Sequence, residues 1–271
     1  MFTVLPMSQT INLKAGEVFT GEIQVANPAD ATADFRYEVA VAPYSVIGED
    51  YTADLGSRLD STQIVDWISI EEPTGSLKPN EVRSVKFKIA VPSDVPAGGQ
   101  YAAITVRSAE DFSAADSQVN NIFEIASVLF ASVEGETVHS GEILENTVPS
   151  FSANNPAAVS VAVKNTGNVH EAAVVKVAVK NVLTGEVLAA EDAEGYVEYI
   201  MPGTTRNLTR EVTGLADLGS FEGTQAVEYL GESSVISSRL VMCPIWFMVL
   251  AGVTIFAIIF AVVRMILKRR A

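Results

Sequence analysis

The sequence predicts an all-β protein of two tandem β-sandwiches followed by one C-terminal transmembrane α-helix. Two observations predict this fold class. Apolar and polar residues alternate at period two in many short segments, and residues 241–263 contain no charged side chain. A helix rises about 1.5 Å per residue, so ~20 residues cross a hydrocarbon core about 30 Å thick. Residues 241–263 are therefore long enough to span a bilayer.

Short alternating strands are expected throughout residues 1–240. The clearest apolar sets are Phe35, Tyr37, Val39 and Val41; Val85, Phe87, Ile89 and Val91; Val159, Val161 and Val163; and Val175, Val177 and Val179. Turn formers such as proline, glycine and asparagine separate these sets. This pattern is typical of sandwiches, and we expect no helix before residue 241.

A weak internal repeat divides residues 1–240 into two halves. Residues 23–27 (IQVAN) and 161–165 (VAVKN) are both alternating strands that end on asparagine. A short apolar-x-turn element occurs three times, as Leu13-Lys14-Ala15-Gly16, Leu77-Lys78-Pro79-Asn80 and Ile200-Met201-Pro202-Gly203, and each copy should form a tight turn. We expect sandwiches at residues 1–134 and 153–238, a linker or connecting strand region at 135–152, the membrane helix at 241–263 and a tail at 264–271.

The tail predicts the orientation of the span. Arg264, Lys268, Arg269 and Arg270 follow the apolar segment without any acidic residue, and such cations remain on the cytoplasmic side. Residues 1–240, which we call the exterior, should then lie outside the cell. The N-terminus has no basic and apolar export signal, so we expect that signal to have been removed or to precede this sequence.

Composition and motifs exclude several functions. The exterior carries 14 cations and 33 acidic residues, a net charge of −19, which disfavours nucleic acid as a partner. His139 and His170 belong to no ligand pair, Cys243 lies in the expected span, and no nucleotide-binding or nucleophile motif occurs. We therefore expect no catalysis, no cofactor and no metal, and we expect His170 to be exposed beside its Thr-Gly-Asn turn.

The longest segment without alternation, residues 45–61, is acidic and interrupts the first sandwich. It has two interpretations. It is either a solvated loop or hairpin, or a partner-binding loop carried on a rigid scaffold. In the second case Glu49, Asp50, Tyr51, Asp54 and Arg58 are the candidate binding residues.

Several motifs resemble the N-terminal domain of bacterial WxL-interacting proteins. They are Phe2-x-Val4-x-Pro6, Leu13-Lys14-Ala15-Gly16-Glu17, Asp66-Trp67-Ile68, residues 77–81 (LKPNE), residues 85–92 (VKFKIAVP) and residues 94–104 (DVPAGGQYAAI). The resemblance implies two immunoglobulin-like sandwiches, of which the first binds peptidoglycan and the second contacts other molecules. It also implies one membrane span and a basic tail.

Two functions remain open. The leading one is a non-catalytic, single-pass surface protein that attaches to cell-wall polymer, to a secreted surface protein, or to both. The alternative is a chaperone-like or structural envelope protein that assists the secretion or assembly of surface proteins. The first sandwich also resembles the immunoglobulin-like fold of pilus chaperones, which bind a subunit by adding a strand.

Overall fold

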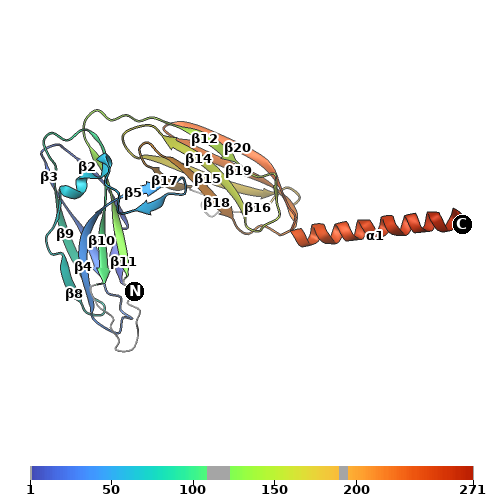
Figure 1. Ribbon diagram of the computed structural model, residues 1–271, viewed down its shortest axis with the longest axis horizontal. Helices are drawn as coiled ribbons and strands as arrows, with labels where there is room; N and C mark the ends of the chain where they lie inside the picture. The colour runs from blue at the N-terminus through green and yellow to red at the C-terminus, as the bar shows by residue number, and fades with distance from the viewer. Residues whose placement is uncertain (1, 109–122, 189–194, 271) are drawn as a thin grey trace. The chain divides into compact units, whose positions relative to one another are not determined.

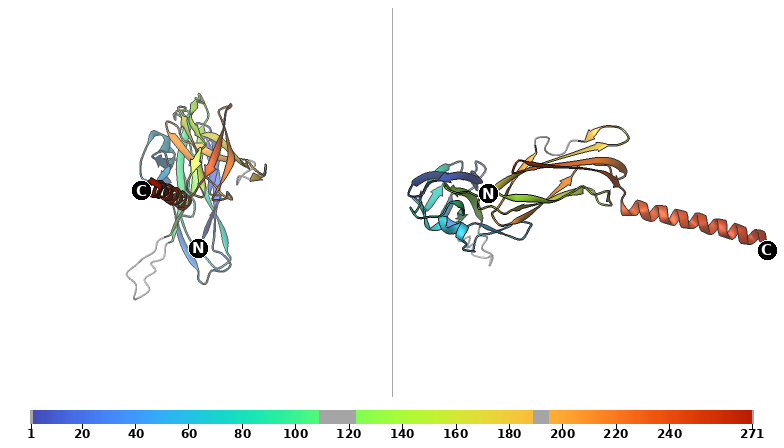
Figure 2. Two further views of the ribbon diagram at one scale, coloured as in Figure 1. Left: turned by 90° about the vertical axis from the view of Figure 1, so that its right-hand side faces the viewer. Right: turned by 90° about the horizontal axis from the view of Figure 1, so that it is seen from above.

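The computed structural model describes residues 2–108, 123–188 and 195–270 (Figures 1 and 2). Strands make up most of this chain, and one long helix, α1 (Ile245–Arg270), ends it. The predicted β class and the C-terminal apolar helix are therefore confirmed.

The chain divides into two compact units. Unit 1 comprises Met1–Ser140 together with Asn165–Glu171 and Met201–Thr204. Unit 2 comprises Gly141–Lys164, Ala172–Ile200 and Thr205–Ala271.

Unit 1 contains two facing sheets, ordered β1-β3-β9-β7 and β2-β11-β10-β4-β8. Their strands are β1 (Thr3–Leu5), β2 (Ser8–Leu13), β3 (Val18–Ala26), β4 (Phe35–Pro43), β7 (Ile68–Ile70), β8 (Thr74–Leu77), β9 (Val82–Ala90), β10 (Gly98–Ser108) and β11 (Glu124–Val133). The N-terminal segment joins both sheets, since β1 pairs antiparallel with β3 and β2 pairs parallel with β11.

The alternation of these strands places one apolar face of each sheet in a shared core. Val85, Phe87 and Ile89 of β9 are buried in one sheet, and Tyr37 and Val39 of β4 are buried in the other. Because successive side chains in a strand point to opposite faces, the outward positions between them remain polar or exposed.

The three repeated apolar-x-turn elements are tight turns, as predicted. In each, the amide at the fourth turn position donates to the carbonyl at the first: Glu17 to Lys14 at 3.0 Å, Glu81 to Lys78 at 3.0 Å, and Thr204 to Met201 at 3.2 Å. The third positions, Gly16, Asn80 and Gly203, have φ values of 77°, 66° and 69°. Positive φ at this position favours glycine or asparagine, which explains the repeated sequence.

The repeated asparagines have a structural role. Asn27 and Asn165 are both buried. The Asn27 Nδ2 donates to the carbonyls of Ala33 and Leu77, each at 3.1 Å, and the Asn165 Nδ2 donates to the carbonyl of Val169 at 2.7 Å. Each side chain thus satisfies backbone carbonyls that would otherwise be buried without a partner.

The expectation that no helix precedes residue 241 is wrong. The segment after β4 forms a hairpin of β5 (Ser45–Ile47) and β6 (Thr52–Asp54), and a 3₁₀ helix, η1 (Asp60–Asp66), follows it. A side chain of β10 holds η1 in place: Gln100 donates to the carbonyl of Asp60 at 2.9 Å and accepts from the amide of Ile64 at 3.1 Å. This support comes from a distant strand, so local periodicity could not predict the helix.

Unit 2 contains a sheet of order β12-β14-β18 and a larger sheet of order β13-β20-β19-β15-β16, with β17 also paired to β15. Its strands are β12 (Gly141–Thr147), β13 (Phe151–Ser152), β14 (Ala157–Asn165), β15 (Glu171–Asn181), β16 (Val187–Leu188), β17 (Tyr196–Ile200), β18 (Thr205–Val212), β19 (Gly219–Tyr229) and β20 (Glu232–Met242). The predicted valine sets of β14 and β15 are buried, as expected.

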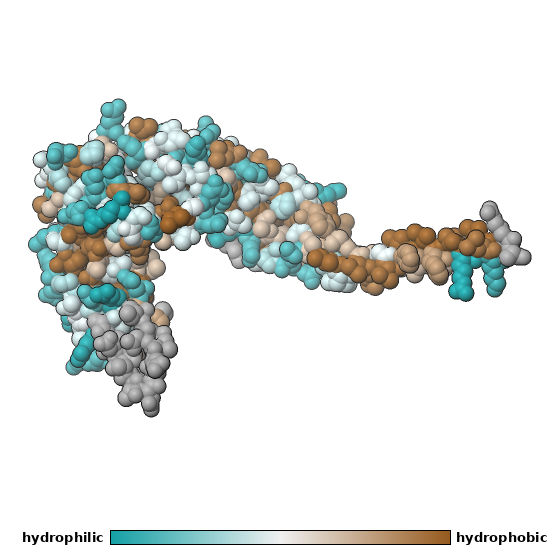
Figure 3. Space-filling model, viewed as in Figure 1, coloured by the Kyte–Doolittle hydropathy of each residue, from teal (hydrophilic) through white to brown (hydrophobic). Residues whose placement is uncertain are grey.

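The apolar helix begins later than residue 241. Val241 and Met242 belong to β20, where Val241 pairs with Phe151 of β13 and with Ser220 of β19. Pro244 then ends the strand, and its carbonyl accepts from the amide of Phe247 at 3.0 Å in the first turn of α1. Within the described residues, α1 is the one helix long and apolar enough to cross a membrane. Figure 3 shows hydrophobic side chains along most of it.

Candidate functional site

A pocket of about 390 Å³ opens at one end of unit 1, where several strands begin or end. We call it the aromatic pocket. It is lined by Phe2, Asn27, Asp30, Ala31, Thr32, Ala33, Asp34, Phe35, Ser108 and Phe123. The register explains this grouping, because Ser108 at the end of β10 pairs with Tyr37, two residues after the start of β4.

Aromatic rings form the apolar part of this pocket. Phe2 and Phe35 stack with centroids 4.3 Å apart and an interplanar angle of 20°. Phe2 is buried, Phe35 is half-buried, and Phe123 is 46% exposed. Phe2 and Phe35 thus cover part of each other's faces, and Phe123 is the ring of the pocket that solvent reaches most.

The rest of the lining includes five polar residues, of which Ser108, Asp30 and Asp34 bear most on the choice of ligand. The Ser108 Oγ is buried and has no hydrogen-bond partner among the described residues. Asp30 and Asp34 are exposed, and carboxylates serve as hydrogen-bond acceptors. A buried hydroxyl without a partner costs about 1–3 kcal/mol, so a ligand would recover part of that energy if the Ser108 side chain turned toward the pocket. The pocket suits a ligand with one apolar face and several hydroxyl or amino donors.

The sequence pattern did not indicate this pocket. Its residues come from four separate regions of the chain, and Phe2 and Phe35 fit the alternation of ordinary core strands. Two features distinguish the pocket residues from ordinary core residues, namely the exposure of Phe123 and the missing hydrogen-bond partner of Ser108. Both features depend on the fold and cannot be read from the sequence.

A second feature of unit 1 is a partly open strand edge. β11 pairs with β10 from Glu124 to Val133, but its ladder with β2 starts only at Val128. The amide of Val128 donates outward to the carbonyl of Met7 at 2.9 Å. Because amides two residues apart point to the same side of a strand, the amide of Ala126 also points outward. Among the described residues, no strand pairs with this edge at 124–127, although the N-terminal segment lies beside its end, where the Ser127 hydroxyl donates to the carbonyl of Pro6 at 2.7 Å.

The predicted binding loop is the β5–β6 hairpin. Glu49 and Asp50 are exposed in its turn, and Tyr51 is half-buried with a φ of 57°. The Tyr51 hydroxyl accepts from the amide of Met201 at 2.9 Å and forms a short hydrogen bond with the Thr204 hydroxyl, both within unit 1. Tyr51 therefore holds a turn of its own unit.

Asp54 and Arg58 are also engaged locally. Hydrogen bonds from Ser57, and then from the amide of Gly56 at 2.8 Å, hold the pKa of Asp54 below its usual value. The Arg58 guanidinium binds both carboxylate oxygens of Asp66 at 2.8 Å. The five predicted loop residues thus do not converge on one site, and partner binding by this loop stays a prediction.

His170 is not exposed as expected. Its ring is half-buried and packs against Tyr101 and Phe130 of unit 1, with centroids 5.7 and 5.3 Å apart. Burial lowers the pKa of His170, because it penalises the charged imidazolium. The neighbouring His139 contacts Glu171 at 2.6 Å. The described part of the chain contains no group of three histidine, cysteine or acidic side chains placed to hold a metal ion.

The predicted membrane-stop residues lie at the end of α1. Arg264, Lys268 and Arg269 are exposed on its last turns, and Arg270 is its last residue. Ala271 lies outside the described residues. The helix therefore has an apolar body with its cations at one end.

No family model matches the sequence, and no curated protein matches it either. The structure is similar to three solved fimbrial chaperones. They are the class 5 fimbriae chaperone CfaA (12% identity, TM-score 0.43, covering 88% of this chain and 99% of that one), the Escherichia coli chaperone DraB (11%, 0.42, 88% and 97%), and the CsuC–CsuE chaperone–adhesin complex of Acinetobacter baumannii (13%, 0.40, 88% and 98%). At these identities and TM-scores the similarity does not indicate what this chain binds.

Proposed function

We propose that this chain is a non-catalytic binding protein, anchored in the membrane by α1, whose unit 1 holds a cell-wall polymer in the aromatic pocket. The observation that carries the proposal is the combination of stacked rings, exposed carboxylates and an unpartnered buried hydroxyl in one pocket. Binding sites for small polar ligands combine an apolar lining with a few such convergent polar groups.

The chemistry of a wall saccharide fits this lining. The C–H face of a sugar ring packs on an aromatic face, and sugar hydroxyls donate to carboxylates such as Asp30 and Asp34. A hydroxyl can both accept from Ser108 and donate to it. Amino groups of a wall peptide would be attracted by the acidic exterior, which carries a net charge of −19.

The location follows from the span and its tail. The proposal includes two immunoglobulin-like sandwiches outside the cell and the cations of α1 in the cytoplasm, as the positive-inside rule predicts. It also includes membership of the WxL-interacting proteins, which rests on the sequence motifs alone. That membership would add a secreted surface protein as a second partner.

The test is co-sedimentation of the full chain, held in nanodiscs, with purified insoluble peptidoglycan. Phe123→Ala removes an exposed ring of the pocket, and we expect binding to weaken about tenfold, which corresponds to ~1.4 kcal/mol. The control is Val18→Ala, because Val18 is also exposed but lies at the opposite end of β3 from Asn27. Equal binding by Phe123→Ala and the parent would exclude the aromatic pocket as the site, and no sedimentation of the parent would refute wall binding.

The chaperone-like function is the second candidate, and the open edge of β11 favours it. An extended segment of another protein could add there as a strand beside residues 124–127, next to the aromatic pocket. Exposed strand edges are templates for such pairing. In this case the ligand would be a polypeptide, and Phe123 would hold one of its apolar side chains.

Ala126→Pro separates the two functions. Proline removes the outward amide of Ala126, and proline is tolerated where the amide of a strand faces away from its neighbour. Strand addition predicts that this variant no longer captures surface proteins from an envelope extract, while peptidoglycan binding stays at the parent level. Unchanged capture by Ala126→Pro would exclude strand addition at β11.

A further inference from the structure

The end of unit 2 that leads into α1 exposes apolar side chains from two strands and two connecting segments. Leu183 is 86% exposed, Leu218 51%, Phe151 48% and Val241 39%. We call these four residues the apolar end. They are brought together by strand pairing, because they are far apart in the sequence.

The register shows that the four residues lie at one level. Val241 pairs with both Phe151 and Ser220. The carbonyl of Ser220 accepts from the amide of Val182 at 3.1 Å, which fixes the start of the turn that carries Leu183. Leu218 directly precedes Gly219, the partner of Met242. The apolar end therefore surrounds the last two residues of β20.

Almost no linker separates the apolar end of unit 2 from the start of α1. The amide of Cys243 still donates to the carbonyl of Ser152 at 3.0 Å, so Cys243 is tied to the sheet. Pro244 then accepts the first helical hydrogen bonds of α1. From Met242 to Ile245 the chain extends at most ~11 Å. The apolar end consequently cannot move away from the start of the span.

The length of the apolar helix fixes its depth. The uncharged part of α1 runs from Ile245 to the residue before Arg264, which gives about 28 Å at ~1.5 Å per residue. This length matches a hydrocarbon core about 30 Å thick. The headgroup layer, ~5–7 Å thick on each side, then contains Pro244 and Cys243. Trp246 is exposed near the start of α1, where tryptophan anchors helices at the membrane interface.

We propose that the apolar end of unit 2 is a lipid-contacting surface, inserted in the headgroup layer of the bilayer that α1 spans. The occupant of this surface is the bilayer because the surface is continuous with the span. An unpartnered apolar cluster elsewhere would have no such defined neighbour. This inference rests on the proposed anchoring by α1.

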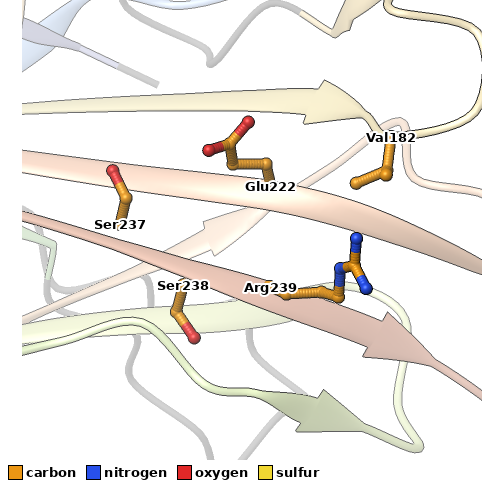
Figure 4. Close-up of a pocket in the computed structure, with 5 residues that line it drawn as sticks. All are labelled: Val182, Glu222, Ser237, Ser238 and Arg239. Carbon is orange, nitrogen blue, oxygen red and sulfur yellow. The ribbon is translucent and has the colours of Figure 1, made fainter.

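Charged groups around the apolar end are placed at its rim. Arg239 lies two residues before Val241 and lines a shallow pocket of about 200 Å³ with Val182 and Glu222. Figure 4 shows its guanidinium extending toward Val182, while the Glu222 carboxylate points away from it. A long cationic side chain can reach lipid phosphates while its stem packs on apolar atoms. Asp217, beside Leu218, accepts a hydrogen bond from Asn155 at 2.7 Å, so its charge has a polar partner.

The test measures the depth of single labels in the full chain, reconstituted in phosphatidylcholine nanodiscs. Leu183→Cys, in a Cys243→Ser background, carries an environment-sensitive fluorophore, and a nitroxide on the lipid headgroup quenches it. The control label is at Ser233→Cys, which is exposed at the opposite end of the β19–β20 hairpin, ~30 Å from Met242. We expect at least twofold stronger quenching at position 183 than at position 233.

A third label separates this inference from the anchoring on which it rests. Phe260→Cys lies in the uncharged part of α1, four residues before Arg264, and a nitroxide attached to the acyl chains should quench it. If position 260 is quenched but positions 183 and 233 are quenched equally, α1 spans the bilayer and the lipid-contacting surface is refuted. If position 260 is not quenched, the anchoring itself is wrong and the surface has no bilayer to enter.

Discussion

Replacing Gln225 by methionine should stabilise unit 2. Gln225 lies in β19 between Val177 of β15 and Ile236 of β20, and its side chain is completely buried. Neither its Oε1 nor its Nε2 has a hydrogen-bond partner among the described residues. An amide buried in this way destabilises a protein by about 1–3 kcal/mol, as judged from mutational data.

Methionine has a similar length and carries no polar atom. Imperfect packing of such a replacement costs up to ~1.5 kcal/mol, so we expect Gln225→Met to raise the free energy of unfolding by about 1 kcal/mol. For a domain of this size that corresponds to a rise of roughly 4–8 °C in the melting temperature.

Differential scanning calorimetry of the chain in detergent measures this change. Gln24→Met is the matched control, because Gln24 is exposed on β3 and surface replacements change stability by less than ~0.5 kcal/mol. A lower melting temperature for Gln225→Met, with Gln24→Met unchanged, would show that the amide of Gln225 is satisfied and would refute this reasoning.

Three further variants test the description of unit 1. Trp67→Ala should cost about 2–3 kcal/mol in urea unfolding, less than for a fully buried tryptophan, because Trp67 is only partly buried after η1; a loss below ~1 kcal/mol would show that it does not pack on the core. Gly21→Ala should cost ~1–3 kcal/mol, since its Cβ would lie 2.4 Å from the ring of the buried Phe87, and a neutral result would mean that this ring moves freely. His170→Gln should reduce the loss of stability between pH 7.5 and pH 5.5. The lowered pKa of His170 means that the folded state binds fewer protons than the unfolded state, so its contribution is fully present above about pH 6.5 and is lost as pH falls. Parallel urea titrations at the two pH values measure this difference, and identical pH dependence in parent and variant would contradict it.

The sequence predicted the parts of the fold that depend on local pattern. Alternation identified core strands such as β9 and β15 because each buries one face. The repeated turns followed from the need for positive φ at Gly16, Asn80 and Gly203. The predicted start of α1 was too early. Val241 and Met242 are uncharged and fit either a strand or a helix, and their pairing with β19 places them in a strand.

The sequence could not predict features that depend on distant contacts. η1 is held by Gln100 from another strand, and His170 is packed by Tyr101 and Phe130. The aromatic pocket is formed where Phe2, Phe35 and Phe123 meet at one end of unit 1. The acidic composition of segment 45–61 suggested a partner-binding loop, but in the structure Asp54 and Arg58 bond to groups of their own segment and of η1.

Protease accessibility in intact cells of the source organism tests the central claim, an exterior binding protein on a membrane anchor, most directly. The experiment uses the full chain with an epitope tag after Ala271, and protease is added outside the cells. We expect residues 1–240 to be digested and the tag to remain in a protected fragment that contains α1, because the positive-inside rule predicts that the cations after Val263 lie in the cytoplasm. Digestion of the tag together with protection of residues 1–240 would place both units inside the cell and would contradict wall binding.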